Sequence, residues 1–100
     1  MLTSKQRSYL KSLAMKEDTI IHLGKASLTD ENAASIDEAL RARELVKIGI
    51  LKNCVDDPKE IAQALTFVTR SEVVQIIGKK IVLYREAKDK PKEKRIRLPR

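Results

Sequence analysis

The sequence predicts an α+β domain of two layers, in which three helices cover one face of a four-stranded mixed sheet. Three observations favour this fold class. Apolar residues recur with helical spacing in three segments, β-branched runs lie between and after those segments, and only two residues separate the last two runs. The expected order of elements along the 100 residues is therefore α-β-α-β-α-β-β.

The first helix is expected to begin at Thr3 or Ser4, because a hydroxyl oxygen there can accept a hydrogen bond from the free amides of the first turn. Apolar residues then recur at spacings of three and four, at Leu10, Leu13 and Ala14. Residues 19–23 (Thr-Ile-Ile-His-Leu) are rich in β-branched side chains and predict the first strand.

The second helix is expected to follow Thr29, which can cap it, while Asp30 and Glu31 are placed favourably near its positive end. The buried stripe of this helix is expected to contain Ala33, Ile36 and Leu40. A second strand follows at residues 45–51, because its apolar residues alternate onto one face.

The third helix has the strongest start signal in the chain, Asp57-Pro58-Lys59-Glu60, which combines a cap, a proline in the first turn and a glutamate at the third position. Its apolar stripe is expected to contain Ile61, Ala64, Leu65 and Val68. A hairpin follows, in which residues 73–77 and 80–85 form the strands. Gly78-Lys79 between them suits a type II′ turn, which has glycine at its first central position.

The composition changes after the hairpin, which divides the chain into a domain at residues 1–85 and a basic tail at residues 86–100. The tail holds seven Lys and Arg residues against three Asp and Glu, and it shows no helical or strand periodicity. We expect a solvated arm that is mobile from residue 86 to residue 95, although Ile96 and Leu98 could dock on the domain.

The net charge of +7 favours an anionic partner, and nucleic acid is the first candidate. No apolar run is long enough to span a bilayer, the N-terminus lacks the apolar core of a signal peptide, and we expect no membrane association. One cysteine, Cys54, and one histidine, His22, leave too few ligands for a zinc centre or a catalytic pair. We therefore expect a non-enzymatic cytoplasmic monomer with no metal, cofactor or small-molecule substrate.

The expected topology brings basic segments together at one edge of the sheet. If both strand–helix–strand connections belong to one sheet, their strands are parallel and their carboxyl ends meet, where open α/β sheets usually bind ligands. The segments expected at this edge are the Gly24 loop, the Lys52-Asn53 turn, the turn at Gly78, Lys79 and Lys80, and the helix start with Lys5 and Arg7.

The loop formed by Gly24, Lys25, Ala26 and Ser27 is the strongest single candidate for a binding site. It joins a strand to a helix, whose first amides are free to bind an anion. Lys25 adds positive charge, and Gly24 allows the backbone to approach a phosphate closely. The alternative is an ordinary connecting loop, since short loops that contain glycine are common.

Three stretches together resemble the CRM domain (chloroplast RNA splicing and ribosome maturation), in its single-domain bacterial YhbY-type form. Residues 23–29 (Leu-Gly-Lys-Ala-Ser-Leu-Thr) are similar to the GxxG loop of that family. Residues 39–48 resemble its segment from the second helix into the second strand, and residues 75–85 resemble its terminal hairpin. The ending at residues 94–100 is similar to the tail of bacterial members.

The resemblance implies a fold like the C-terminal domain of translation initiation factor three. It also implies binding to structured RNA and, in bacteria, association with precursors of the large ribosomal subunit. Carried over by position, Gly24, Lys25, Ala26 and Ser27 would contact phosphate, with the amides of Ala26 and Ser27 as donors. This chain departs from the family pattern at Ser27, where the second glycine of GxxG is expected, and serine would be strained there if the loop needs a positive φ.

Two further arginines, Arg41 and Arg43, are candidates for RNA contact, although positive charge at a helix end also has a local stabilising role. The few aromatic residues argue against base stacking as the main mode of binding, which favours recognition of phosphates and RNA shape. Three alternatives stay open: a module for duplex DNA, a small enzyme that cradles a phosphate in the Gly24 loop, and an adaptor that binds another protein.

Overall fold

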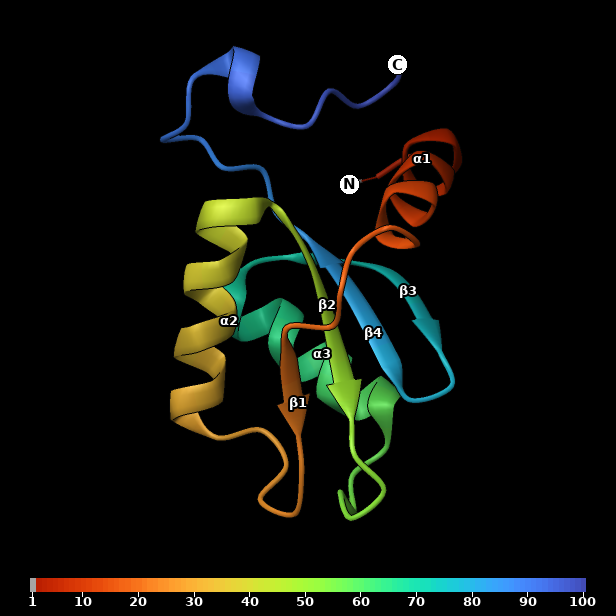
Figure 1. Ribbon diagram of the computed structural model, residues 1–100, viewed down its shortest axis with the longest axis vertical. Coiled ribbons are helices and arrows are strands. Elements are labelled where there is room, and N and C mark those ends of the chain that lie inside the picture. The colour runs from red at the N-terminus through yellow and green to blue at the C-terminus, as the bar shows by residue number, and fades with distance from the viewer. Residues whose placement is uncertain (1) are drawn as a thin grey trace.

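The computed structural model describes residues 2–100 and contains the elements in the predicted order (Figure 1). The helices are α1 (Ser4–Ala14), α2 (Asp30–Arg43), α3 (Pro58–Thr69) and the short 3-10 helix η1 (Lys92–Lys94). The strands are β1 (Ile21–Leu23), β2 (Leu45–Ile50), β3 (Glu72–Ile77) and β4 (Lys80–Tyr84). The predicted fold class, three α-helices with a four-stranded mixed sheet, is confirmed.

The strands lie in the order β1-β2-β4-β3, so the last strand of the chain is inserted between β2 and β3. β1 and β2 pair in parallel, whereas β4 is antiparallel to both of its neighbours, as the hairpin predicted. Gly78 has a φ of 54°, which agrees with a tight turn that requires glycine at its first central position. The carboxyl ends of β1, β2 and β3 therefore lie at the same edge of the sheet (Figure 1).

Each α-helix begins at the cap that the sequence indicates. The Thr3 hydroxyl oxygen accepts a hydrogen bond from the Gln6 amide at 3.1 Å, and the Gln6 side chain accepts one from the Thr3 amide in return. Thr29 caps α2, and Asp57 caps α3 with Pro58 in the first turn. Because these caps are local, they set the helix starts independently of tertiary packing.

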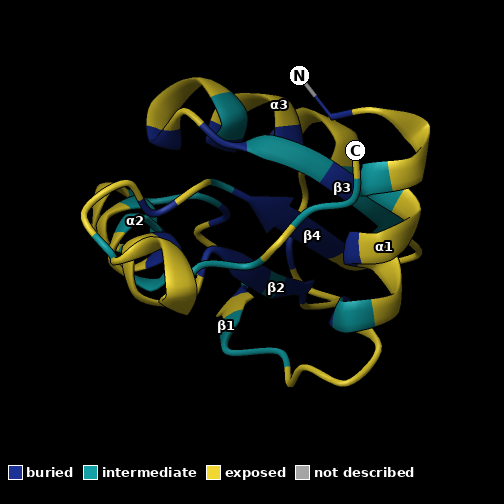
Figure 2. Cartoon of the chain, turned by 90° about the horizontal axis from the view of Figure 1, so that it is seen from above, coloured by how far each residue is buried: buried dark blue, intermediate teal, exposed yellow. Residues whose placement is uncertain are grey.

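The placement of α1 corrects the prediction that all three helices cover one face, because apolar clusters lie on both faces of the sheet. The cluster beneath α2 and α3 includes Leu23, Ile36, Leu40, Ile48, Leu65, Ile81 and Leu83. The cluster beneath α1 includes Leu10, Ala14, Leu45, Val74, Val82 and Tyr84. Figure 2 shows α1 on one side of the strands and α2 and α3 on the other, so the fold has three layers.

The position of α1 on the second face is explained by β4, where Ile81, Val82, Leu83 and Tyr84 are all buried. Successive side chains of a strand point to opposite faces, so a continuous apolar run in a central strand must be covered on both sides. The sequence of β2 does not reveal that both faces of the sheet are covered, because Lys47 interrupts the apolar residues on the face that α1 covers. α1 is therefore required as the third layer.

The apolar stripe of α3 is also corrected. Ile61 and Leu65 are buried as predicted, but Ala64 and Val68 are exposed, and Val68 retains 58% of its accessible surface. Thr69 is buried in their place, and its hydroxyl donates to the Leu65 carbonyl oxygen at 2.6 Å. Residues 61, 64, 65 and 68 share a helical spacing, and periodicity alone cannot decide which edge of such a stripe meets the sheet.

The segment 86–100 docks on the domain at Ala87, Ile96 and Leu98, which corrects the interpretation as a fully solvated arm, whereas the mobility of residues 86–95 stays a prediction. The Glu44 carboxylate, which is 1% exposed, accepts hydrogen bonds from the Ala87 amide at 3.2 Å and the Ile96 amide at 2.8 Å. Ile96 and Leu98 pack against the cluster beneath α1, which confirms that they dock. These contacts fix the path of the segment on both sides of η1 (Figure 1).

Candidate nucleic-acid interface

Three loops meet at the edge of the sheet where β1, β2 and β3 end. Two hydrogen bonds tie them together: the Leu51 amide donates to the Leu23 carbonyl oxygen at 2.8 Å, and the Ile50 amide donates to the Lys79 carbonyl oxygen at 2.7 Å. We call the loops at residues 24–27, 51–54 and 78–80 the open edge. Their predicted convergence is confirmed, whereas the contact of these residues with RNA stays a prediction.

The first loop of the open edge is a tight turn closed by a hydrogen bond from the Ser27 amide to the Gly24 carbonyl oxygen at 2.8 Å. Ser27 has a φ of 56° and is 8% exposed, so a serine occupies the left-handed conformation that glycine adopts without strain. The Ser27 amide is therefore committed to the turn, and its expected role as a phosphate donor is wrong. Lys25 and Ala26 are exposed, and within residues 2–100 their amides donate no hydrogen bond.

Gly24 lies beside the neighbouring loop of the open edge. A Cβ atom at Gly24 would lie 3.4 Å from Oδ1 of Asn53 and 3.4 Å from Cδ1 of Leu51. These are ordinary van der Waals distances, so the packing of the loops at residues 24–27 and 51–54 does not require glycine at position 24, and the left-handed residue of the turn is Ser27.

The start of α2 is a poorer anion site than predicted. Thr29 accepts the hydrogen bond of the Asn32 amide at 3.0 Å, and the first turn carries Asp30 and Glu31. Asp56 and Glu60 border the Gly24 loop on its α3 side, along a cleft of about 350 Å³. These carboxylates repel phosphate, so an RNA backbone is expected to reach Lys25 from the side of the sheet that carries α1.

Lys5 and Arg7 lie away from the open edge, which corrects their expected position. The Leu2 amide, just before α1, donates to Oε1 of Glu72, the first residue of β3, at 3.0 Å. The other end of α1 lies beside β2, where Lys47 Nζ donates to the Ala14 carbonyl oxygen at 3.3 Å. α1 thus runs in the same direction as β3, and its first turn lies at the opposite end of the sheet.

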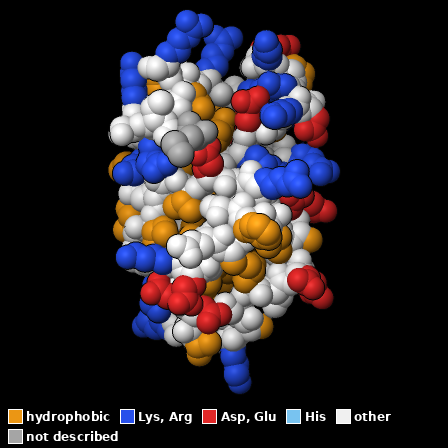
Figure 3. Space-filling view, turned by 180° about the vertical axis from the view of Figure 1, so that it is seen from behind, with side chains coloured by type: hydrophobic (Ala, Val, Ile, Leu, Met, Phe, Trp, Pro, Cys, Tyr) orange, Lys and Arg blue, Asp and Glu red, His pale blue; other side chains and the backbone are white. Residues whose placement is uncertain are grey.

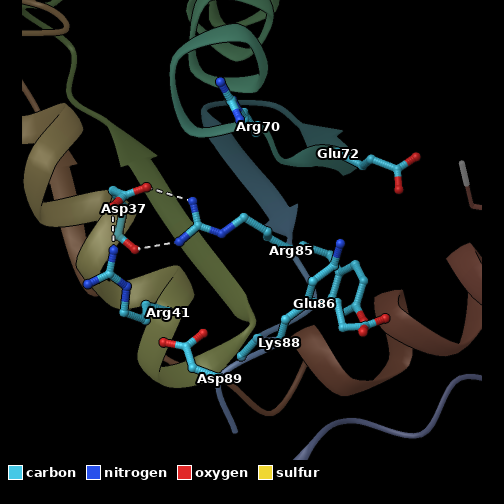
Figure 4. Close-up of a pocket in the computed structure, with 10 residues that line it drawn as sticks. Asp37, Arg41, Arg70, Glu72, Arg85, Glu86, Lys88 and Asp89 are labelled. Carbon is cyan, nitrogen blue, oxygen red and sulfur yellow. Dashed lines mark hydrogen bonds and ion pairs between the residues drawn. The ribbon is translucent and has the colours of Figure 1, made fainter.

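Arg41 and Arg43 close α2 at that opposite end, so they are also remote from Lys25. Arg41 lines a cavity of about 510 Å³. The other residues that Figure 4 labels at this cavity are Asp37, Arg70, Glu72, Arg85, Glu86, Lys88 and Asp89. The Asp37 carboxylate contacts Arg85 Nη1 at 2.6 Å and Arg41 Nη2 at 3.9 Å. Acidic and basic side chains balance in this cavity, so it offers no concentrated positive charge to phosphate.

Sequence reasoning omitted Lys47 from the site, and it placed Lys52 at this edge without naming it as an RNA contact. Lys52 is exposed in the second loop of the open edge, beside Lys25 and Lys79. Lys47 lies on the face of β2 that α1 only partly covers, close to Lys80. A signal for Lys47 was present, because it is the only charged residue in the apolar strand 45–50 (Leu-Val-Lys-Ile-Gly-Ile).

The aromatic residues do not form a stacking platform at the open edge. Tyr84 is 5% exposed, and its burial, with further contributions from Glu44, Glu86 and Glu72, raises the pKa of its hydroxyl to about 12. Phe67 is 86% exposed, but it lies on α3. Figure 3 shows hydrophobic side chains gathered in the middle of the back face, the side on which α3 lies.

The structure adds two findings about other classes of site. Within residues 2–100, no group of three or more His, Cys, Asp or Glu side chains is placed to hold a metal ion. In the same part of the chain, no helix combines the length and the apolar character needed to cross a membrane.

Comparison with known proteins places these features in a family. The profile of the CRS1 / YhbY (CRM) domain matches residues 2–85. A Bacillus subtilis protein named as a probable RNA-binding protein, YqeI, is 44% identical over 99 residues, which cover 99% of this chain and 100% of the relative. A Haemophilus influenzae RNA-binding protein is 34% identical over 99 residues, with 99% of this chain and 96% of the relative covered.

A solved structure agrees with the family match and with these two relatives. The solution structure of a Staphylococcus aureus protein, described as a candidate RNA-binding protein, has a TM-score of 0.80 and 47% sequence identity, and the match covers 99% of this chain and 100% of that one. These relatives are named for RNA binding and none of them for a catalytic activity, in line with a non-enzymatic module. The chain therefore belongs to the CRS1 / YhbY (CRM) domain family.

Proposed function

We propose that this protein binds structured RNA through the open edge, and that its target is ribosomal RNA in assembling large ribosomal subunits. The observation that carries the proposal is the convergence of Lys25, Lys52 and Lys79 on three adjacent loops. Lysines in such a cluster attract the phosphate backbone, and the free amides of Lys25 and Ala26 can donate to the same oxygens.

The surroundings of these lysines favour recognition of RNA shape over readout of the base sequence. Phosphate contacts position a protein on RNA without reading its sequence, and a platform for splayed bases needs exposed aromatics on neighbouring strands. Because Tyr84 is buried, Phe67 lies on α3 and Tyr9 lies on α1, residues 2–100 offer no such platform of neighbouring strands at the open edge. We therefore propose that the protein holds a folded RNA segment by its backbone.

Two alternatives receive less support. A duplex DNA module would insert a helix into the major groove, but the helix start nearest the open edge carries Asp30 and Glu31, which repel phosphates. An enzyme acting on a phosphorylated substrate would need a nucleophile and a base within hydrogen-bond reach, and Cys54 donates instead to the Asp56 carbonyl oxygen at 3.9 Å. A binding competition between structured RNA and duplex DNA distinguishes the first alternative, the duplex DNA module, from the proposed RNA-binding function.

The direct test replaces Lys25 with alanine and measures affinity for several structured RNAs over a range of salt concentrations. The loss of one phosphate contact should make the slope of log affinity against log salt shallower by about 0.7–0.9. Affinity should fall about equally for different RNAs, because phosphates carry no sequence information. The free energy of unfolding should change by less than about 0.5 kcal/mol, since Lys25 is an exposed loop residue.

The matched control replaces Glu17 and Asp18, two exposed residues in the connection between α1 and β1, with alanine. This variant should keep the salt slope of the parent protein. Unchanged affinity and unchanged slope for Lys25→Ala, with binding lost on removal of residues 86–100, would assign RNA binding to the C-terminal segment instead.

The ribosomal part of the proposal needs a test in cells. Crosslinking the protein to RNA in cells and sequencing the attached fragments should enrich large-subunit ribosomal RNA and its precursors. Enrichment of messenger RNA alone would retain RNA binding but reject the ribosomal target. We further propose that the protein acts as a monomer in the cytoplasm, where a reducing environment keeps the buried Cys54 as a thiol.

A further inference from the structure

α1 covers only part of its face of the sheet, and a groove remains between its last turn and the strands. The groove has a volume of about 150 Å³. Apolar side chains and the stems of three lysines line it, and the complete lining is Lys11, Ala14, Met15, Lys47, Gln75, Ile77, Lys80 and Val82. It adjoins the open edge, because Lys80 directly follows the Gly78-Lys79 turn and pairs with Gly49.

The charged side chains that line the groove all have one sign, while Glu17 and Asp18 lie in the adjacent connection that carries Thr19. Lys11, Lys47 and Lys80 line it, and no acidic residue does. Lys47 Nζ is held 3.3 Å from the Ala14 carbonyl oxygen, and Lys80 Nζ is held 2.9 Å from Thr19 Oγ1. Each ammonium group has three donor hydrogens, so both lysines can bind a phosphate oxygen without giving up these contacts.

The size of the groove limits its occupant. Pockets for drug-sized ligands are about 300–1,000 Å³, so this groove suits a single planar ring better than a larger molecule. Met15 and Ile77, which are 82% and 60% exposed, provide accessible apolar surface for the face of such a ring. The half-buried Gln75 amide supplies both a donor and an acceptor, which match the edge of a base.

We propose that this groove, which we call the lysine groove, binds one unpaired nucleobase of the RNA, with the flanking phosphates held by Lys11, Lys47 and Lys80. The proposal rests on the proposed RNA-binding function and adds a second point of contact to it. A duplex or hairpin could lie along the open edge, and a nucleotide bulged from it would reach the lysine groove on the side free of Asp56 and Glu60. The protein would thereby distinguish folded RNA that carries a bulge from perfectly paired RNA.

The test compares two RNA hairpins of the same stem, one fully paired and one with a single bulged nucleotide. The parent protein should bind the bulged hairpin more tightly. Gln75→Leu keeps the size of the side chain but removes the amide, and it should reduce this preference about fivefold, as expected for one lost hydrogen-bonding group. A fluorescent purine at the bulge should change its emission on binding to the parent protein, and change it less with Gln75→Leu.

A second pair of variants separates the groove from general electrostatics. Lys11→Gln with Lys80→Gln should weaken the bulged hairpin more than the paired one. The matched control, Lys59→Gln with Lys88→Gln, removes the same charge from exposed residues outside the groove and should weaken both hairpins equally. Unfolding measurements on each variant show whether a change in affinity comes from loss of the fold.

The outcomes distinguish the two proposals. If the protein binds neither hairpin nor other structured RNA, the proposed function itself fails. If it binds both hairpins with equal affinity, or if Gln75→Leu keeps the full preference for the bulge, the function stands and the nucleobase site is overturned. Displacement of the bulged nucleotide by a short acidic peptide, without loss of the paired hairpin, would overturn it in favour of a protein partner for the groove.

Discussion

The two ends of the sheet use positive charge in different ways. At the open edge, Lys25, Lys52 and Lys79 are exposed, and none of them makes a side-chain hydrogen bond or ion pair within residues 2–100. At the opposite end, which we call the closed end, Arg85 and Arg95 bind the protein itself. Arg85 contacts Asp37 and donates to the Thr69 carbonyl oxygen at 2.6 Å, and Arg95 donates to the Lys88 carbonyl oxygen at 2.6 Å.

This difference shows why a net charge of +7 does not by itself locate a binding surface. The planar guanidinium group can donate several hydrogen bonds in a fixed geometry, so arginine suits the task of joining segments of the chain. Lysine has a compact charge on a flexible stem and can reach a phosphate that arrives from solvent. Replacement of Arg85 or Arg95 at the closed end should therefore change stability, and replacement of Lys25, Lys52 or Lys79 at the open edge should change RNA binding.

The largest effect is expected for Glu44→Ala at the closed end. The buried carboxylate accepts the amides of Ala87 and Ile96, and its loss leaves both donors without this partner. The free energy of unfolding should fall by about 2–3 kcal/mol, measured by urea denaturation, and hydrogen exchange at both amides should accelerate. Glu86→Ala, which removes an exposed partner of Arg95, serves as the control and should cost less than about 1 kcal/mol.

An unchanged stability of Glu44→Ala would contradict the closed end as a structural clamp. It would instead support the initial expectation that residues 86–95 are mobile, which backbone amide relaxation measures directly.

A smaller loss is expected for Arg85→Lys. Lysine retains the charge but cannot contact the Asp37 carboxylate and the Asp37 and Thr69 carbonyl oxygens together. The free energy of unfolding should fall by about 1.5 kcal/mol while RNA affinity stays the same. Arg41→Lys is the matched control, because the Arg41 side chain is 64% exposed and 3.9 Å from Asp37, and it should change stability by less than about 0.5 kcal/mol. A loss of RNA affinity in Arg85→Lys at unchanged stability would move the binding surface to the closed end.

Alkaline pH tests the closed end through Tyr84, whose pKa is raised from 10.0 to about 12, mainly by burial. The folded protein holds the hydroxyl proton more tightly than the unfolded chain, so this contribution to stability is complete below pH 10 and is lost as the pH rises toward 12. In a Tyr9→Phe background, tyrosinate absorbance should appear near pH 12 in the folded protein and near pH 10 after unfolding. Appearance near pH 10 in both states would show that Tyr84 is not held in a buried, acid-lined site.

The smallest effect is expected at the open edge, for Ser27→Gly. Ser27 has a φ of 56°, and glycine removes the strain of that conformation, so the free energy of unfolding should rise by about 0.5–1 kcal/mol. Ala26→Gly is the matched control, because Ala26 has no positive φ, and it should lower stability. RNA affinity should change little in Ser27→Gly, since the Ser27 amide is already bonded to Gly24. A large gain in affinity would show that serine strains the binding conformation of the loop.

The sequence by itself determined the order of the elements, the helix starts and the hairpin. Thr3, Thr29 and Asp57 cap helices through bonds to residues two or three positions away, and Gly78 makes a turn of two residues. Such signals depend only on residues close in the sequence, so they can be recognised without knowing which distant residues pack against each element. The convergence of Lys25, Lys52 and Lys79 also followed, because parallel strands joined by helices must end at the same edge.

Only the tertiary structure decided which surfaces each element covers. The sequence allows α1 to pack on either face of the sheet, and the burial of Val82 and Tyr84 placed it on the face opposite α2 and α3. This position puts Lys5 and Arg7 at the closed end and leaves the lysine groove beside the last turn of α1. The path of residues 86–100 depends on the Glu44 carboxylate, which lies 43 positions before Ala87. Contacts between such distant residues form only when the whole core is assembled, and no periodicity within a segment can report them.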